Sequence, residues 1–209
     1  MRGRKGVKFR MRLERVPSAV GFLEIKGAAD GVAAVDTAVK AALVEVLQNK
    51  VVCSGKFTVL LAGQTAAVEA AVAAARKEVG ASIYDYCVIG RVHPSLYWAL
   101  HDQFPGDGLL KKKSSPAASS AVGIVETLSI AVGLEAADAA LKAAEVNLLE
   151  LRLGYALGGR SYLAFTGTTG AAKAALDRAV QAASDRGGLG SSCLIPQFNA
   201  AKFPFMAMA

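Results

Sequence analysis

The sequence predicts an α+β fold of two tandem βαββαβ units, each with an antiparallel sheet and two helices in the ferredoxin-like order. Three observations predict it. A segment recurs 102 residues further along the chain, both halves show the same order of apolar strands and periodic helices, and small apolar residues dominate. Of the 209 residues, 53% are hydrophobic and 41 are alanine. This composition favours closely packed helices over a deep catalytic pocket walled by large side chains.

The internal repeat is clearest in the first strand and helix of each unit. The segment AVGFLE at 19–24 recurs as AVGIVE at 121–126, and residues 19–47 and 121–149 share 14 identities in 29 positions. The offset then grows to 104 and later to 106, where Cys87 and Ile89 correspond to Cys193 and Ile195. A tandem duplication explains this pattern.

Each unit contains the same elements in the same order. We expect an opening strand at 20–25 and 122–128, and two further strands at 45–52 and 57–62, then at 148–156 and 161–166. A second helix starts after Thr65 or Thr168, either of which can cap a helix, and closing strands lie at 83–91 and 191–197. The first helix of each unit shows apolar residues at helical spacing: Val32, Val35, Val39 and Leu43, then Leu134, Ala137 and Leu141.

The chain divides into four parts. Residues 1–17 form a basic extension, 18–101 the first domain, 102–119 a linker rich in proline, glycine, serine and lysine, and 120–209 the second domain with its C-terminal tail. The extension carries six of the seven net positive charges, so the remaining chain is nearly neutral. A basic arm can bind nucleic acid or an acidic partner. A solvated arm is the interpretation we prefer, with Met11 as an alternative start, and nucleic acid is not an expected partner.

Several function classes lack support in the sequence. No apolar run is long enough for a membrane helix, and no apolar segment follows the basic residues as in a secretory signal. Three cysteines do not form a disulfide framework, and a reducing compartment fits them best. Neither a Ser-His-Asp arrangement nor a Cys/His cluster is present. The run from Gly167 to Gly170 is expected to be a capped helix start rather than a phosphate loop.

Beyond these patterns, the sequence resembles a known family. The segments AVGFLEIKG…VDTAVKAALVEVL and AVGIVETLSIAVGLEAADAALKAAEVNLLELRL, the glycine turns CSGKF and LGGRS, and the closing strands YDYCVIGRVHP and SSCLIPQFN resemble the bacterial microcompartment shell domain, in unpermuted order. The likeness covers both halves and is to the tandem-domain trimeric class. It implies a homotrimer forming a pseudo-hexagonal tile, with hexameric and other shell proteins as partners. It also implies a location in the microcompartment shell within the cytoplasm, and no enzymatic activity.

The resemblance assigns a pore to two turns. Cys53, Ser54 and Gly55 in the first domain, with Leu157, Gly158 and Gly159 in the second, are implied to line a central pore. Cys53 precedes Gly-Lys-Phe, as in relatives that hold a [4Fe–4S] cluster on the three-fold axis, so the resemblance implies a cluster shared through three Cys53 thiolates. Cys-Ser stands here in place of Cys-Pro. An open pore and a zinc site remain alternatives. Cys87 and Cys193, equivalent in apolar strands, are expected to be buried core thiols.

Three further residues are implied to lie at the tile edge. Lys40 and Lys142 each follow an aspartate by four residues, a spacing that alone indicates a helical ion pair. The resemblance implies instead that both lysines meet neighbouring tiles. Arg91 stands where shell domains carry an edge arginine, whereas the second copy has Gln197. The alternative function is a soluble trimeric ferredoxin-like protein that binds a ligand or regulates, and such a protein would not form sheets.

Overall fold

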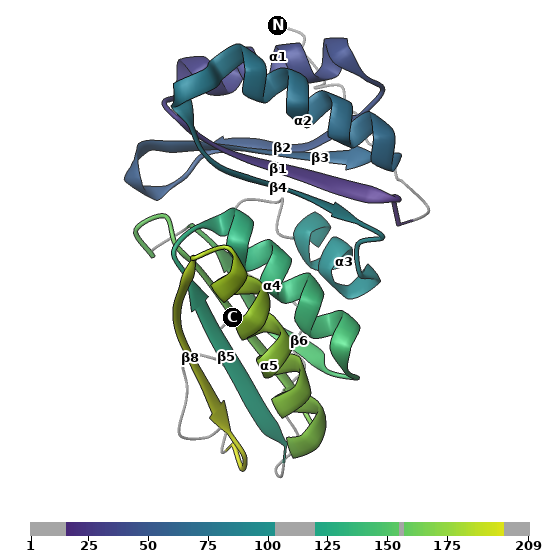
Figure 1. Ribbon diagram of the computed structural model, residues 1–209, viewed down its shortest axis with the longest axis vertical. Helices are drawn as coiled ribbons and strands as arrows, with labels where there is room; N and C mark the ends of the chain where they lie inside the picture. Colours follow the sequence, from purple (N-terminus) through teal and green to yellow (C-terminus); the bar gives the residue numbers. More distant parts are fainter. Residues whose placement is uncertain (1–15, 103–119, 155–156, 199–209) are drawn as a thin grey trace, which may run out of the picture.

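The computed structural model describes residues 16–102, 120–154 and 157–198, except the side chains at 53, 101 and 102. In the first lobe, four strands form a fully antiparallel sheet in the order β2-β3-β1-β4. Helices α1 and α2 cover one face of this sheet (Figure 1). The elements are β1 (Ala19–Lys26), α1 (Ala28–Ala41), β2 (Glu45–Val51), the short 3-10 helix η1 (Cys53–Gly55), β3 (Lys56–Gly63), α2 (Thr65–Val79), the 3-10 helix η2 (Gly80–Ser82) and β4 (Ile83–Gly90).

The second lobe repeats this arrangement. Its sheet order is β6-β7-β5-β8, again antiparallel, and α4 and α5 cover one face. The elements are β5 (Ala121–Thr127), α4 (Ile130–Ala143), β6 (Asn147–Leu153), β7 (Ser161–Gly167), α5 (Thr169–Asp185) and β8 (Leu189–Ile195). The predicted duplicated α+β fold is therefore confirmed.

The growth of the repeat offset from 102 to 104 occurs in the turn after β6. In the first lobe, the Val52 N–H donates to the Lys56 carbonyl at 2.8 Å. In the second lobe, the Gly154 N–H donates to the Arg160 carbonyl at 2.9 Å, so this turn is two residues longer. The two sheets keep their register, because the insertion lies entirely within the turn.

One helix was not predicted. Helix α3 (Pro94–Asp102) follows the first lobe in sequence but packs on α4 and β6 of the second lobe. Pro94 occupies the first helical position, where its missing N–H costs nothing. Leu96, Tyr97 and Leu100 are fully buried, so this helix fastens the two lobes together.

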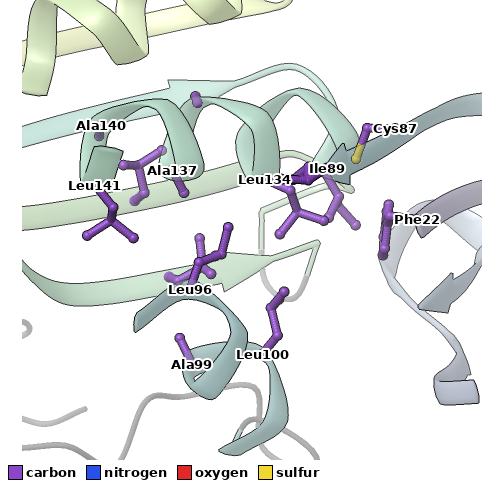
Figure 2. Close-up of a cluster of buried hydrophobic side chains, with 14 of the residues drawn as sticks. Phe22, Cys87, Ile89, Leu96, Ala99, Leu100, Leu134, Ala137, Ala140 and Leu141 are labelled. Carbon is purple, nitrogen blue, oxygen red and sulfur yellow. The ribbon is translucent and has the colours of Figure 1, made fainter. Parts of the chain in front are cut away.

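The buried side chains form two clusters. One fills the space between the first sheet and α1 with α2. The larger cluster begins on the other face of that sheet, at residues such as Phe22 and Cys87, and continues through α3 and α4 into the second lobe (Figure 2). The first sheet is thus buried on both faces, and α4 packs between the two sheets. We call this contact between β4, α3 and α4 the lobe junction.

The apolar stripe predicted on the first helix mostly faces away from its own lobe, although Val35 packs against that lobe's core. The buried residues of α1 are Gly31, Ala34 and Ala38, whose small side chains let the helix approach the sheet closely. A Cβ at Gly31 would overlap the ring of Phe57. Val32 and Val39 are instead 61% and 44% exposed, whereas their equivalents Leu134 and Leu141 are 0% and 5% exposed at the lobe junction. The stripe therefore marks a packing surface between lobes.

The two predicted caps of the second helices have different outcomes. Thr168 caps α5, because its side chain accepts a hydrogen bond from the Ala171 N–H at 3.2 Å. This confirms the capped helix start predicted for residues 167–170. Thr65 is the first residue of α2, and its preceding residue, Gln64, makes no side-chain cap.

Candidate pore and assembly surfaces

The turns that the sequence assigns to the pore lie side by side in one chain. Within η1, Ser54 and Gly55 have φ values of 71° and 69°, a left-handed conformation that lets the strand reverse within three residues. A Cβ built on Gly159 would lie 3.3 Å from Ser54 Oγ, so the turn after β6 touches η1 directly. Ser54, Gly55 and Gly158 are exposed, Leu157 is half-buried and Gly159 is buried. The backbone of Cys53 begins this turn, and its side chain lies outside the described set.

Lys56 joins the two turns. Its Nζ lies 2.9 Å from Glu24 Oε2 and 3.1 Å from the carbonyl oxygen of Gly159, and 3.5 Å from the ring centroid of Tyr84. Lys56 and Glu24 are both buried. A buried ammonium needs such partners to offset its lost hydration. Lys56 therefore fixes the second-lobe turn against the first lobe.

Glu24 also links the lobes through the start of α4. Its Oε1 accepts a hydrogen bond from the Ala131 N–H at 2.9 Å. A carboxylate at a helix N-terminus is favoured by the exposed N–H groups and the helix dipole. Burial raises the pKa of Glu24, although the hydrogen bonds from Ala131 and Lys56 act to lower it. Ser129 completes the cap by accepting from the Val132 N–H at 3.2 Å.

The equivalent residues of the other lobe lack this helix. Glu126 and Arg160 correspond to Glu24 and Lys56 and form an ion pair at 3.2 Å, with half or more of the Arg160 side chain exposed. The helix that corresponds to α4 is α1, whose N-cap residue is Gly27 and has no side-chain cap. The second lobe thus has a carboxylate, Glu126, with no helix start beside it. The first lobe has a helix start without a side-chain cap, since Asp30 in its first turn accepts a hydrogen bond from Ser82 instead.

The edge residues fall into two places. Lys142 pairs with Asp138 and also donates to the Gly90 carbonyl at 3.2 Å, which places it beside the exposed Arg91. Asp138 Oδ1 accepts from the His93 N–H at 2.8 Å. Lys40 lies on the other lobe and pairs only locally with Asp36 at 2.5 Å, both side chains being largely exposed. A single chain therefore brings Arg91 and Lys142 together, and leaves Lys40 apart.

A polar network at the lobe junction was not predicted. Arg186 Nη2 lies 2.6 Å from Asp85 Oδ1, and its Nη1 lies 2.5 Å from Glu135 Oε2. Ser129 donates to the other Asp85 oxygen. No sequence pattern indicated this network, because Glu135 corresponds to Ala33 and the pairs join residues far apart in the chain.

The two cysteines in the closing strands differ in exposure. Cys87 is buried at the lobe junction, and burial raises the pKa of its thiol well above the usual range. Cys193 is exposed, so the prediction of a buried core thiol is wrong for the isolated chain. The register is the same, since Cys87 pairs with Phe22 and Cys193 with Ile124. The difference is that no helix covers this face of the second sheet in the described chain.

No group of three or more His, Cys, Asp or Glu residues is arranged to hold a metal ion among the described residues. Within the same described ranges, no helix has the length and apolar character required to span a membrane.

The chain contains two copies of one fold, and surfaces that are buried in one copy are exposed in the other. These features are typical of a structural protein that assembles from repeated units. The family model of the BMC domain matches residues 19–92 and 121–198, so the chain belongs to the BMC-domain family. It is 34% identical over 179 residues to the bacterial microcompartment shell protein PduT of Citrobacter freundii, covering 86% of this chain and 92% of that protein. It is also 34% identical over 89 residues to the carboxysome shell protein CcmK2 of Synechococcus elongatus, covering 41% of this chain and 87% of that protein.

A solved structure agrees with these relatives. The microcompartment protein from Desulfitobacterium hafniense DCB matches with a TM-score of 0.75 and 33% identity, covering 88% of this chain and 97% of that one. The resemblance found in the sequence is thereby confirmed. The chain is a bacterial microcompartment shell protein, with a structural rather than an enzymatic role. The alternative of a soluble regulatory protein has no support among these relatives.

Proposed function

We propose that three copies of this chain join head to tail into a closed ring of six lobes, and that this ring is a pseudo-hexagonal tile of the shell. The observation that carries the proposal is the lobe junction. The surfaces that meet there within one chain have equivalents at the two ends of the chain, and those equivalents include exposed and half-buried apolar residues. A contact between them in neighbouring copies would repeat the junction.

The apolar surfaces support this repetition. At the junction, Leu134 of α4 packs near Phe22 and Ile89 on the outer face of the first sheet (Figure 2). The equivalents are Val32 on α1, which is exposed, and Ile124 with Ile195 on the second sheet, which are half-buried. Val32 of one copy therefore fits against the second sheet of the next. Cys193 would then be buried as Cys87 is.

The polar groups support the same pairing. Glu24 accepts a hydrogen bond from the Ala131 N–H at the start of α4. By equivalence, Glu126 would accept a hydrogen bond from the Ala29 N–H at the start of α1 in the neighbouring copy. This contact would give the uncapped helix its carboxylate and bring the partly exposed Glu126–Arg160 pair out of water.

Closure at three chains follows from the number of lobes. A head-to-tail contact repeated by a constant rotation forms a ring when the rotation closes. In this ring, the lobe junction within each chain and the matching contact between two chains, which we call the trans junction, would be nearly equivalent. A hexagon of lobes therefore requires three chains with two lobes each. This agrees with the trimeric class that the sequence resembles.

We further infer that the paired turns surround a central pore, and that Cys53 is the ligand of a [4Fe–4S] cluster there. Each chain places one cysteine in this turn, and the longer turn at 155–159 has none, so the ring would present three thiols. Thiolates are the usual ligands of such clusters, which pass single electrons. Ser54 and Gly55 hold the left-handed turn, and Lys56 anchors it to Gly159. An open metabolite pore is the competing function of the same turns.

The ring is tested by native mass spectrometry and by electron microscopy of the purified chain, alone and mixed with a hexameric shell protein. A three-chain mass and incorporation into flat sheets are expected. A stable monomer at micromolar concentration would contradict the ring. A discrete trimer that never enters sheets would instead favour a soluble role.

The cluster is tested by anaerobic iron–sulfur reconstitution, followed by visible absorbance and spin resonance of the reduced protein. About four irons per trimer are expected in the natural chain, and none in Cys53→Ala. Cys193→Ala is the matched control and should keep its iron. Absence of a cluster in the natural chain would leave the open pore as the function of these turns.

A further inference from the structure

The first lobe carries an apolar surface that no described residue covers. Val39 on α1 is 44% exposed, Leu43 just after this helix is 94% exposed, and Val51 on β2 is 59% exposed. We call these three residues the α1–β2 face. Exposed apolar residues that gather on neighbouring elements usually mark a contact surface.

The second lobe shows what covers the equivalents of Val39 and Val51, whereas Glu145, the equivalent of Leu43, is exposed there. There, α3 packs on α4 and β6, the counterparts of α1 and β2. Figure 2 shows Leu96 and Leu100 of α3 on the side that faces α4, near Leu141 and Leu134. Leu141, the equivalent of Val39, is almost completely buried as a result. Leu153, the equivalent of Val51, packs against the same cluster.

The segment that corresponds to α3 in the repeat is the C-terminal tail. The chain leaves both sheets in the same way. The Arg91 N–H donates to the Ser18 carbonyl at 2.6 Å, and the Phe198 N–H donates to the Ser120 carbonyl at 3.0 Å, Ser18 and Ser120 being repeat equivalents. Phe198 is buried like its equivalent Val92. The next residues are α3 in the first case and 199–209 in the second.

The sequence of this tail suits an apolar surface. Residues 199–209 lie outside the described part of the chain, and their only charged side chain is Lys202. At the offset of 106, Phe203, Phe205 and Met206 correspond to Tyr97, Ala99 and Leu100 of α3. Large apolar residues thus recur at three of these positions, whereas Lys202 stands in place of the buried Leu96 and Pro204 in place of Trp98.

We propose that residues 199–209 of one copy cover the α1–β2 face of the next copy in the ring. Figure 1 shows α1 at one end of the molecule and the end of β8 at the other, so the tail starts far from its own α1. In the head-to-tail ring it starts beside the neighbour's α1, because α3 starts beside α4. The proposal rests on the ring of the proposed function and adds a strap at each of its three trans junctions.

The test is a disulfide crosslink in a Cys53→Ala, Cys193→Ser background, where the remaining thiol, Cys87, is buried. Val39→Cys with Phe205→Cys should give covalent dimers and trimers on a non-reducing denaturing gel after mild oxidation. Glu69→Cys with Phe205→Cys is the matched control, because Glu69 is exposed on α2, away from the face. It should give at least about tenfold less crosslinked product, as expected for a site without local contact.

The native mass of the same samples separates the two proposals. A native trimer that gives no crosslinked ladder, or a disulfide formed within one chain, overturns the strap and leaves the ring intact. A native monomer overturns both. As a second measurement, the alkylation rate of Val39→Cys should be higher in a chain that stops after Phe198 than in the full chain. The alkylation rate of Glu69→Cys should be the same in both. Equal alkylation rates at Val39→Cys would overturn the strap.

Discussion

Glu24 holds two lobes together with one carboxylate. One oxygen pairs with Lys56, which follows η1, and the other accepts a hydrogen bond from the Ala131 N–H in the first turn of α4. Burial outweighs these interactions and raises the pKa of Glu24 above its ordinary 4.5. A carboxyl group with a raised folded pKa stabilises the fold fully below its unfolded pKa, and this contribution is lost as pH rises through the folded value. The folded chain therefore depends on Lys56 more strongly near neutral pH than at acidic pH, because more of the Glu24 carboxyl group is ionised there.

Lys56→Met should destabilise the chain by about 3–5 kcal/mol at pH 7, because it leaves a buried carboxylate unpaired. The loss of stability should be smaller near pH 4.5, because the raised pKa of Glu24 favours its protonated form in the folded chain there. Urea unfolding at both pH values measures this difference. Arg160→Met is the control and should cost about 0–1 kcal/mol, because its pair with Glu126 is partly exposed. A loss for Lys56→Met that does not change with pH would show that Glu24 is not the group left unpaired.

Cys193 reports on the ring at a single atom. The thiol is exposed in the single chain, whereas its equivalent Cys87 is buried. In Cys53→Ala protein, we expect Cys193 to react slowly with an aromatic disulfide reagent when the ring is intact, because reaction requires an accessible thiolate. Dilution below the dissociation concentration should make one thiol per chain react quickly. Fast reaction in a verified trimer would place Cys193 outside the interface.

At the level of elements, α1 and α4 show how one pattern serves two environments. Both helices bury small residues against their own sheets, and both carry larger apolar residues on the opposite side. The second set is buried on α4 only because α3 and the first sheet cover it. Helix periodicity alone identifies such a face, but it does not say which neighbour covers the face.

Equal substitutions on the two helices should therefore have different effects. Val32→Asp should leave the chain folded and dissociate the ring, because it places an unpaired charge in the trans junction. Burying such a charge at an interface costs about 2–5 kcal/mol. Leu134→Asp should unfold or aggregate the chain, since Leu134 is fully buried. Circular dichroism and native mass measurement of both variants test the pair. A trimer that persists in Val32→Asp would contradict this junction.

The duplication made most of the fold predictable. Both repeats showed the same order of strands and helices, and glycines near 55 and 158 marked the two turns, which the structure confirms. The assignment of these turns to a pore came from the family resemblance and stays a prediction. Helix α3 was missed because residues 94–102 share no identical residue with their repeat equivalents at 200–208 and lie next to linker-like residues. The contact of Glu24 with Ala131 was beyond prediction, because it joins different repeats and depends on how the lobes pack. The same dependence explains the exposure of Cys193.

At the scale of the whole molecule, the proposed ring treats each chain as two lobes that are joined by one junction. The junction within the chain is fully formed, and the two ends of the chain would carry the separate halves of another such junction. The edge residues follow this division. Arg91 and Lys142 lie together at the lobe junction. In the proposed ring, Lys40 would lie beside Pro196 and Gln197 of a neighbour, the equivalents of Gly90 and Arg91. Alternate corners of the tile would therefore differ, with arginine at one and glutamine at the next.

This arrangement predicts how the edge lysines respond to charge reversal. Lys40→Asp should cost only a few tenths of a kcal/mol in the folded chain, because it breaks an exposed helical pair. Lys142→Asp should cost more, since it removes the contact with Gly90 and places a second carboxylate beside Asp138. Both should preserve the trimer and weaken sheet formation, and the double variant should abolish it. Lys173→Asp is the matched control, because Lys173 forms a similar exposed pair with Asp177 on α5. Electron microscopy of sheets and native mass measurement report the two effects separately. Sheets from the double variant would remove both lysines from the edge, whereas loss of sheets in Lys173→Asp as well would indicate a general effect of charge.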